Sequence, residues 1–116
     1  MKKILLLSFF LLAACFMFAQ NDGPTADYYE NGKLKFKGQY QDGKKVGEWK
    51  FFFETGKIKA EGLYIDGLKS GTWITYHSNS MKKSKGNFKR KGDESVKDGD
   101  WAFYHKNGVA SEKGKY

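Results

Sequence analysis

The two histidines, His77 and His105, are the residues best suited to metal binding or acid–base chemistry in this sequence. They occupy equivalent places in successive units of an internal repeat. In an antiparallel sheet such places lie two strands apart, roughly 10 Å at the usual strand spacing. Zinc binds histidine nitrogens at about 2 Å, so a shared site would need backbone rearrangement. We therefore expect half-exposed variants of an aromatic position, not a metal centre.

The carboxylates offer no better catalytic arrangement. One cluster lacks the spaced ligands of a calcium loop; it consists of Asp93, Glu94, Asp98 and Asp100. Others recur with the repeat, as turn-forming residues do; these are Glu30, Asp42, Glu54 and Asp66. The glycines belong to turns and not to a strand-to-helix phosphate loop. The sequence predicts no catalytic, cofactor-binding or metal-binding residue, no cofactor, and a protein that is not an enzyme.

The N-terminus has the pattern of an export signal. Met1–Lys3 is basic, residues 4–18 are mainly apolar, and the chain turns polar after Ala19. The apolar run is shorter than the roughly 20 residues of a membrane-spanning helix. Cleavage after Ala19 would remove residues 1–19 and yield a periplasmic or secreted protein.

A second processing route stays open. Residues 12–15, Leu-Ala-Ala-Cys, resemble a lipobox, which would remove residues 1–14 and leave Cys15 lipidated as an outer-membrane lipoprotein. Cys15 is the only cysteine, so no disulfide framework can form. The domain must be held by packing alone.

The chain is basic, with a formal net charge of +8, and Arg90 is its only arginine. Readers of nucleic acid favour arginine for bidentate base contacts, so we expect no nucleic-acid partner. The densest basic run is either a solvated hairpin face or a surface for anionic lipid or glycan. It comprises Lys82, Lys83, Lys85, Lys89, Arg90 and Lys91.

A tandem repeat organises the rest of the chain. Twenty-four positions separate Gly38 from Gly62, Gly62 from Gly86, and Trp49 from Trp73. After a linker at 20–27, the units are 28–51, 52–75, 76–103 and 104–116, and the third carries a four-residue insertion. Such a unit cannot bury its apolar face alone and must stack on its neighbours. We expect the insertion to lengthen a surface loop over residues 89–97.

Each unit contains two strand-like runs separated by turn residues. Residues 34–40 alternate apolar and polar without error. Asn-Gly or Asp-Gly between such runs is a strong hairpin signal. The turn pairs begin at Asn31, Asp42, Thr55, Asp66 and Asn107, and Ser80 replaces a turn glycine in the third unit. The sequence predicts an all-β, elongated, single-sheet antiparallel meander of seven or eight strands.

The register follows if Gly43-Lys44 and Thr55-Gly56 form two-residue turns. Trp49 then lies opposite Gly38 and Gly62, where the glycines leave room for the indole. Phe51 faces Phe36 and Ala60, and Phe53 faces Leu34 and Ile58. One face then carries Leu34, Phe36, Tyr40, Trp49, Phe51, Phe53, Ile58, Tyr64 and Trp73. The other is mostly Lys, Gln and Glu, with Phe52, Leu63, Ile65, Ile74 and Tyr76 among them.

The segments 29–43 and 47–49, repeated at 53–56 and 71–73, resemble the bacterial MORN-repeat variant. The resemblance covers nearly everything after the signal. It implies stacked β-hairpins in one twisted sheet. Eukaryotic MORN proteins are associated with membrane contact and scaffolding, and many bacterial variants are labelled YwqK-type antitoxins.

We expect an exported scaffolding surface of the bacterial envelope that binds another protein. Exposed aromatic residues dominate such interfaces, and here they are Trp49, Phe51, Phe53, Tyr64, Trp73 and Trp101. A homo-oligomer would cover the same face. The alternatives are a peripheral binder of anionic lipid or glycan, whose attachment weakens with salt, and an antitoxin in a tight complex with a toxic protein.

Overall fold

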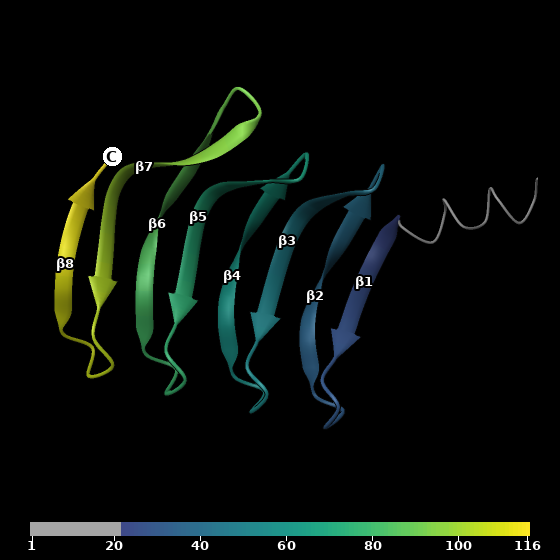
Figure 1. The fold of residues 1–116 in the computed structure, drawn as a ribbon, viewed down its shortest axis with the longest axis horizontal. Helices are drawn as coiled ribbons and strands as arrows, with labels where there is room; N and C mark the ends of the chain where they lie inside the picture. Colours follow the sequence, from purple (N-terminus) through teal and green to yellow (C-terminus); the bar gives the residue numbers. More distant parts are fainter. Residues whose placement is uncertain (1–21) are drawn as a thin grey trace, which may run out of the picture.

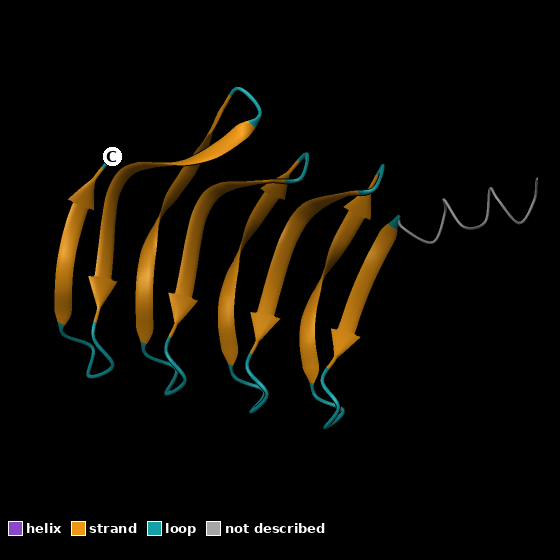
Figure 2. Cartoon of the chain, in the orientation of Figure 1, coloured by secondary structure: helices purple, strands orange, loops and turns teal. Residues whose placement is uncertain are grey.

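The computed structural model describes residues 22–116 as one antiparallel sheet. The expected signal segment, with Cys15, lies outside these residues. The strands follow chain order across the sheet (Figures 1 and 2). They are β1 (Gly23–Tyr28), β2 (Leu34–Gln41), β3 (Lys44–Phe52), β4 (Ile58–Ile65), β5 (Leu68–Tyr76), β6 (Lys82–Lys91), β7 (Glu94–Tyr104) and β8 (Ala110–Lys115). The single-sheet, all-β prediction is confirmed, and no helix long and apolar enough to span a membrane occurs in this part of the chain.

The first strand corrects the expected linker at 20–27. Residues 23–28 form β1, which pairs with β2 from Gly23–Tyr40 to Tyr28–Leu34. A glycine and a proline at its start suit an edge strand, because only one side of β1 must supply ladder hydrogen bonds. The ordered sheet therefore begins at least five residues earlier than the sequence pattern indicated.

The turns β2–β3, β4–β5 and β6–β7 lie at one end of the sheet and are called the tip turns. The first two of them are two residues long. Asp42 and Gly43 have φ values of 52° and 74°, and Asp66 and Gly67 have 53° and 82°. Two successive left-handed residues match the right-handed twist of the flanking strands. The expected Gly43-Lys44 turn is therefore wrong by one residue, since Lys44 already pairs with Gln41.

A bulge compensates for that shift. The β2–β3 ladder skips a residue between Lys37 and Gln39, and Gly47 in the facing stretch has a φ of 71°. The same device recurs at Gly71 and Gly99, with φ values of 66° and 67°. Bulges bend the strand that carries them, and β3, β5 and β7 each bend sharply in Figure 1. The two extra residues of β3 restore the predicted pairing of Phe36 with Phe51. On its other side β3 pairs without a break through Gly47, and Trp49 pairs with Gly62 as predicted.

The opposite end of the sheet carries the base turns, which join β1–β2, β3–β4, β5–β6 and β7–β8. In the second, Phe53 N–H donates to Lys57 O at 2.8 Å and Gly56 N–H to Phe53 O at 2.9 Å. The loop is thus three residues long, not the two-residue Thr55-Gly56 turn. In consequence Phe52, not Phe53, pairs with Ile58. The pairings of Phe51 with Phe36 and Ala60 are as predicted.

The insertion in the third unit also differs from expectation. Lys89 pairs with Val96, Arg90 with Ser95 and Lys91 with Glu94, so the strands continue through it. A two-residue turn at 92–93 closes a longer hairpin, which projects beyond its neighbours in Figure 1. An insertion of four residues adds two to each strand without disturbing the alternation of faces. It therefore extends the ladder and does not form a loop.

The tryptophans form the core of this thin fold. Trp49, Trp73 and Trp101 are 1%, 3% and 5% exposed. Each indole lies against a glycine of the preceding strand, where a Cβ would overlap the ring; the pairs are Trp49–Gly38, Trp73–Gly62 and Trp101–Gly86. The expected close approach of indole and glycine is confirmed, although Gly62, paired with Trp49, receives the ring of Trp73.

Candidate functional site

The face that carries the three tryptophans is called the tryptophan face. Each indole N–H donates to a carbonyl of the neighbouring strand, from Trp73 to Leu63 at 3.0 Å and from Trp101 to Asn87 at 3.1 Å. Edge-to-face contacts link the units, for example Trp49 to Tyr64 at 5.9 Å between ring centroids. Buried indoles with satisfied N–H groups stabilise the sheet itself.

The burial bears on the six residues expected to bind a partner. The sheet's own side chains bury four of them, Trp49, Trp73, Trp101 and Tyr64. Little of their surface is therefore accessible to a binding partner. Phe51 and Phe53 are only partly buried. Phe53 lies beyond the end of β3 and is not among the side chains packed on the tryptophan cluster; those are Phe36, Tyr40, Phe51 and Phe88. The six residues therefore do not form one exposed patch.

Lysines lie over the rings of the tryptophan face. Lys45 Nζ is 5.1 Å from the ring centroids of both Trp49 and Tyr64. Lys69 and Lys97 repeat the arrangement at 4.9 Å and 5.0 Å from the next two indoles. Sequence reasoning missed these contacts, although a signal exists, because each lysine precedes its tryptophan by four positions. Ammonium groups over ring faces are attracted by the ring quadrupole.

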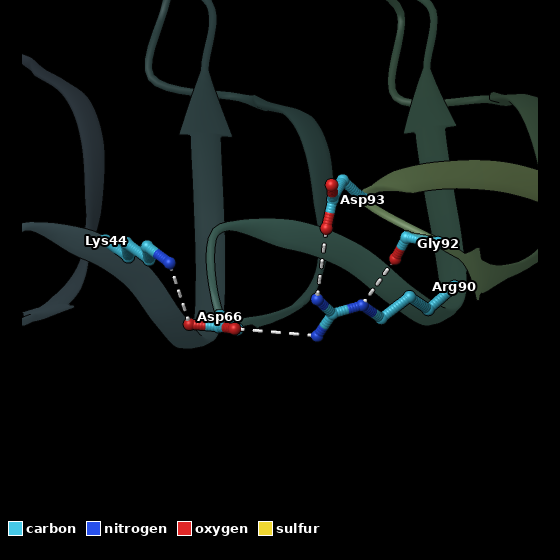
Figure 3. Close-up of polar contacts among 5 residues, drawn as sticks. All are labelled: Lys44, Asp66, Arg90, Gly92 and Asp93. Carbon is cyan, nitrogen blue, oxygen red and sulfur yellow. Dashed lines mark hydrogen bonds and ion pairs between the residues drawn. The ribbon is translucent and has the colours of Figure 1, made fainter.

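The tip turns are joined by ion pairs (Figure 3). Asp66 receives Lys44 Nζ at 3.3 Å and Arg90 at 3.5 Å, from the hairpins on either side. Arg90 Nε also donates to Gly92 O at 2.8 Å, and its other terminal nitrogen lies 3.8 Å from Asp93. These groups are about half exposed or more, so each pair contributes little alone. Together they hold the long third hairpin against the second.

The basic run expected to form an anionic-surface site is divided. Lys85 pairs across the sheet with Ile74 on the face away from the tryptophans, whereas Ser84 and Gly86 belong to the tryptophan face. Lys89 lies 3.5 Å from Asp98, and Arg90 is engaged at the tip turns. The remaining members, Lys82, Lys83 and Lys91, are exposed along β6. The run is thus split between two faces and partly neutralised.

The face away from the tryptophans carries an apolar patch, defined as Leu63, Ile65, Leu68 and Ile74. Leu63 and Ile65 are 39% and 54% exposed. Ile65 pairs with Leu68, and a shallow hollow of about 360 Å³ is lined by Leu63 and Ile74. The equivalent residues of the first unit are polar: Gln39, Gln41, Lys44 and Lys50. Sequence reasoning placed three of the four on this face but did not recognise that the patch breaks the repeat.

Titratable chemistry is sparse. Burial, followed by the charge of Glu61 and the 3.2 Å hydrogen bond to it, raises the pKa of Tyr76. Burial, followed by the charge of Tyr40, raises the pKa of Tyr64. His77 Nε2 lies 2.7 Å from Tyr104 O, so it joins two base turns. Within residues 22–116 no group of three or more His, Cys, Asp or Glu side chains is placed to hold a metal.

The MORN repeat variant profile matches three consecutive segments of the chain, residues 21–42, 45–66 and 69–90. Each matched segment holds one hairpin, β1–β2, β3–β4 or β5–β6, and successive segments begin 24 positions apart. A comparison with curated proteins gives no match. Because the matched segments make up more than half of the sequence, the chain belongs to the MORN repeat variant family.

Proposed function

We propose that this protein is a non-enzymatic scaffold of the bacterial envelope that binds another protein through its apolar patch. Repeat arrays act as extended surfaces, and family membership is consistent with a binding role. The envelope location rests on the export-like N-terminal sequence.

The aperiodic apolar patch is the observation that carries this proposal. A repeat keeps a residue type wherever the stacking of units requires it, as it does for the tryptophans and their glycines. Leu63 stands where the first and third units have Gln39 and Asn87, and Ile65 where they have Gln41 and Lys89, so stacking does not require these two apolar residues. They lie on the face where Lys, Gln and Glu predominate. Exposed apolar clusters rimmed by polar residues are typical of protein-binding sites.

The rim of the patch fits a protein partner. Glu48 and Glu61 line the same hollow as Leu63 and Ile74, and Lys50 lies 4.0 Å from Glu48. Both signs of charge therefore surround the apolar centre, which favours a mixed polar rim over a uniformly anionic surface. Burial of the exposed Leu63 and Ile65 side chains would provide the central contact.

Crosslinking in the native cells, followed by capture of the full-length protein at high salt, tests the proposal. We expect a stoichiometric protein band, because apolar contacts survive salt that screens exposed charges. The double variant Leu63→Lys, Ile65→Lys should lose this band. The matched control Gln39→Lys, Gln41→Lys adds the same charge at the equivalent positions of the first unit and should keep it.

Two outcomes would oppose the proposal. Retention of the band by the Leu63→Lys, Ile65→Lys variant, with normal folding by circular dichroism, would exclude the apolar patch as the binding site. Loss of the band at high salt from the unchanged protein would favour charge-driven attachment. An antitoxin role is the special case in which the captured partner is toxic and the complex restores growth.

A further inference from the structure

A row of lysines and aromatic rings crosses the tryptophan face beside the indoles. Ladder pairs place Tyr40 next to Lys45 and Tyr64 next to Lys69. Phe88 pairs with Lys97 in the same way, and Tyr116 closes the row, with its ring 5.2 Å from Lys97 Nζ. We call Lys45, Lys69 and Lys97 the lysine row.

The charges of the lysine row are available to a ligand. Among residues 22–116 the ion pairs involve Lys44, Lys50, Lys89 and Arg90, and none involves a member of the row. Lys69 and Lys97 are exposed and Lys45 is partly so. The cross-strand row through Phe36 and Phe51 on this face carries carboxylates only on the outermost strands, at Asp27 and Glu112.

The rings fix where these charges lie. Lys45 is within 5.8 Å of three ring centroids, Lys69 within 5.3 Å of two, and Lys97 within 5.3 Å of three. A lysine held over rings loses less side-chain freedom when it binds an anion than a free lysine does. The row is therefore preorganised, unlike the exposed lysines of β6.

Spacing selects the kind of anion. The three lysines are on β3, β5 and β7, so neighbours lie two strands apart, about 10 Å at the usual strand spacing. Along one strand of a nucleic-acid duplex, each phosphate advances only about 3.4 Å of helix axis, much less than the spacing of the lysines. In an extended acidic polysaccharide with one carboxylate per disaccharide, the charges repeat over the length of two sugars, which is comparable to the lysine spacing.

We propose that the lysine row binds an extended polysaccharide that carries one carboxylate per disaccharide. The chain would cross the strands, with a carboxylate at each ammonium group of the row. This surface is on the face opposite the apolar patch, so the two sites can be occupied together. The inference is independent of the protein-binding proposal.

Binding of hyaluronan to the purified full-length protein, measured by isothermal titration calorimetry at low salt, tests this inference. Hyaluronan has one carboxylate per disaccharide, polygalacturonate has one per sugar, and dextran is neutral. We expect hyaluronan to bind at least as tightly as polygalacturonate, despite its lower charge density, and dextran not to bind. Affinity for hyaluronan should fall as salt rises.

A matched pair of triple variants locates the site. Lys45→Gln, Lys69→Gln, Lys97→Gln should weaken hyaluronan binding about tenfold, the effect of three exposed ion pairs together. Lys37→Gln, Lys85→Gln, Lys113→Gln removes the same charge from exposed lysines of the opposite face. This control should retain nearly full affinity. Circular dichroism and thermal unfolding establish that both variants are folded.

Several results would overturn the inference. Equal weakening by the two folded triple variants would show only general attraction to a basic protein. Tighter binding of polygalacturonate would show that charge density, not spacing, decides. Binding to phosphatidylserine vesicles without binding to hyaluronan would assign the row to a membrane surface. None of these results depends on whether Leu63 and Ile65 bind a protein.

Discussion

At the scale of single residues, the fold depends on the contact between each indole and a glycine. Gly38, Gly62 and Gly86 have no left-handed φ, so backbone freedom does not explain them. Each is there because a side chain would occupy the space of an indole. Glycine inside a strand weakens pairing, and here the packing of the ring offsets that cost.

Replacement of Gly86 with alanine tests this contact. The added methyl group would overlap the ring of Trp101, so we expect a loss of about 1–3 kcal/mol in the free energy of unfolding, as for overpacked cores. Lys85→Ala, one residue away on the opposite face, is the control and should change stability by less than about 0.5 kcal/mol. Equal effects in urea denaturation would argue against the indole contact.

Ser80 is strained in the turn where the other units have glycine. Its φ is 71°, whereas Gly32, Gly56 and Gly108 have 83°, 94° and 86°. We expect Ser80→Gly to raise the free energy of unfolding by about 0.5–1 kcal/mol, because relief of the left-handed strain exceeds the entropy cost of glycine. Ser70→Gly, inside β5, should instead destabilise. A lower melting temperature for Ser80→Gly would contradict this account.

The raised pKa values of two tyrosines predict how the free energy of unfolding changes at high pH. Because the pKa values of Tyr64 and Tyr76 are raised in the folded state, the folded protein keeps their phenolic protons in a range above about pH 10 where the unfolded chain loses them. Their contribution to stability is complete below about pH 10 and is lost as pH rises through the folded pKa values. We expect Tyr76→Phe to lessen the fall in unfolding free energy above about pH 10. An unchanged slope would mean that Tyr76 titrates alike in both states.

The sequence predicted these residue contacts incompletely. The Gly–Trp spacing predicted the close approach, because both residue types recur with the repeat. It could not reveal that Gly62 pairs with Trp49 yet receives Trp73, since that depends on how far each indole leans along the sheet. The lysines above the rings were missed because alternation alone assigns lysine to solvent, whereas its long stem can lie along an aromatic surface.

At the scale of elements, side chains of the base turns hold successive hairpins together unevenly. Tyr29 hydroxyl donates to Phe52 O at 2.6 Å and Asn31 Nδ2 to Glu54 O at 2.9 Å, which joins the first two turns. His77 and Asn79 make the equivalent contacts to the fourth turn. In the second turn these places are held by Phe53, whose side chain has no polar atom, and Thr55, which has no amide group. The junction of the second and third base turns is therefore the weaker one.

Thr55→Asn should supply one missing contact. By analogy with Asn31, its amide would reach the carbonyl of Ser78, for a gain of about 0.5–1.5 kcal/mol in unfolding free energy. The reciprocal change, Asn31→Thr, should cost a similar amount at the first junction. Both are measured by chemical denaturation. A neutral Thr55→Asn together with a harmful Asn31→Thr would show that the second junction cannot adopt the geometry of the first.

The elements show why strand number was easier to predict than register. Turn pairs and alternation predicted a meander of seven or eight strands, and the structure has eight in chain order. Prediction of the register also required the position of every bulge. In the β2–β3 ladder, the misplaced turn at Gly43-Lys44 compensated for the unrecognised bulge at Gly47. Glycine at 47, 71 and 99 was the available signal, since a left-handed residue inside a strand-like run favours a bulge. The 89–97 insertion was misjudged because an even insertion can extend both strands.

At the scale of the whole molecule, a single sheet divides two tasks between its faces. The tryptophan face provides the packing that a second layer would supply in a sandwich. The opposite face carries the apolar patch with its exposed Leu63 and Ile65, which makes it the better surface for a protein partner. The central claim is that the tryptophans form the core of the isolated sheet and are buried without a binding partner.

Acrylamide quenching of tryptophan fluorescence in the isolated, monomeric protein tests this claim most directly. All three tryptophans of the chain contribute to the fluorescence, and each is at most 5% exposed. We expect weak quenching and blue-shifted emission that persist on dilution, with a rise to the level of free indole only on unfolding. Quenching close to that of free indole in the folded monomer would contradict the account and make the tryptophan face an uncovered binding surface.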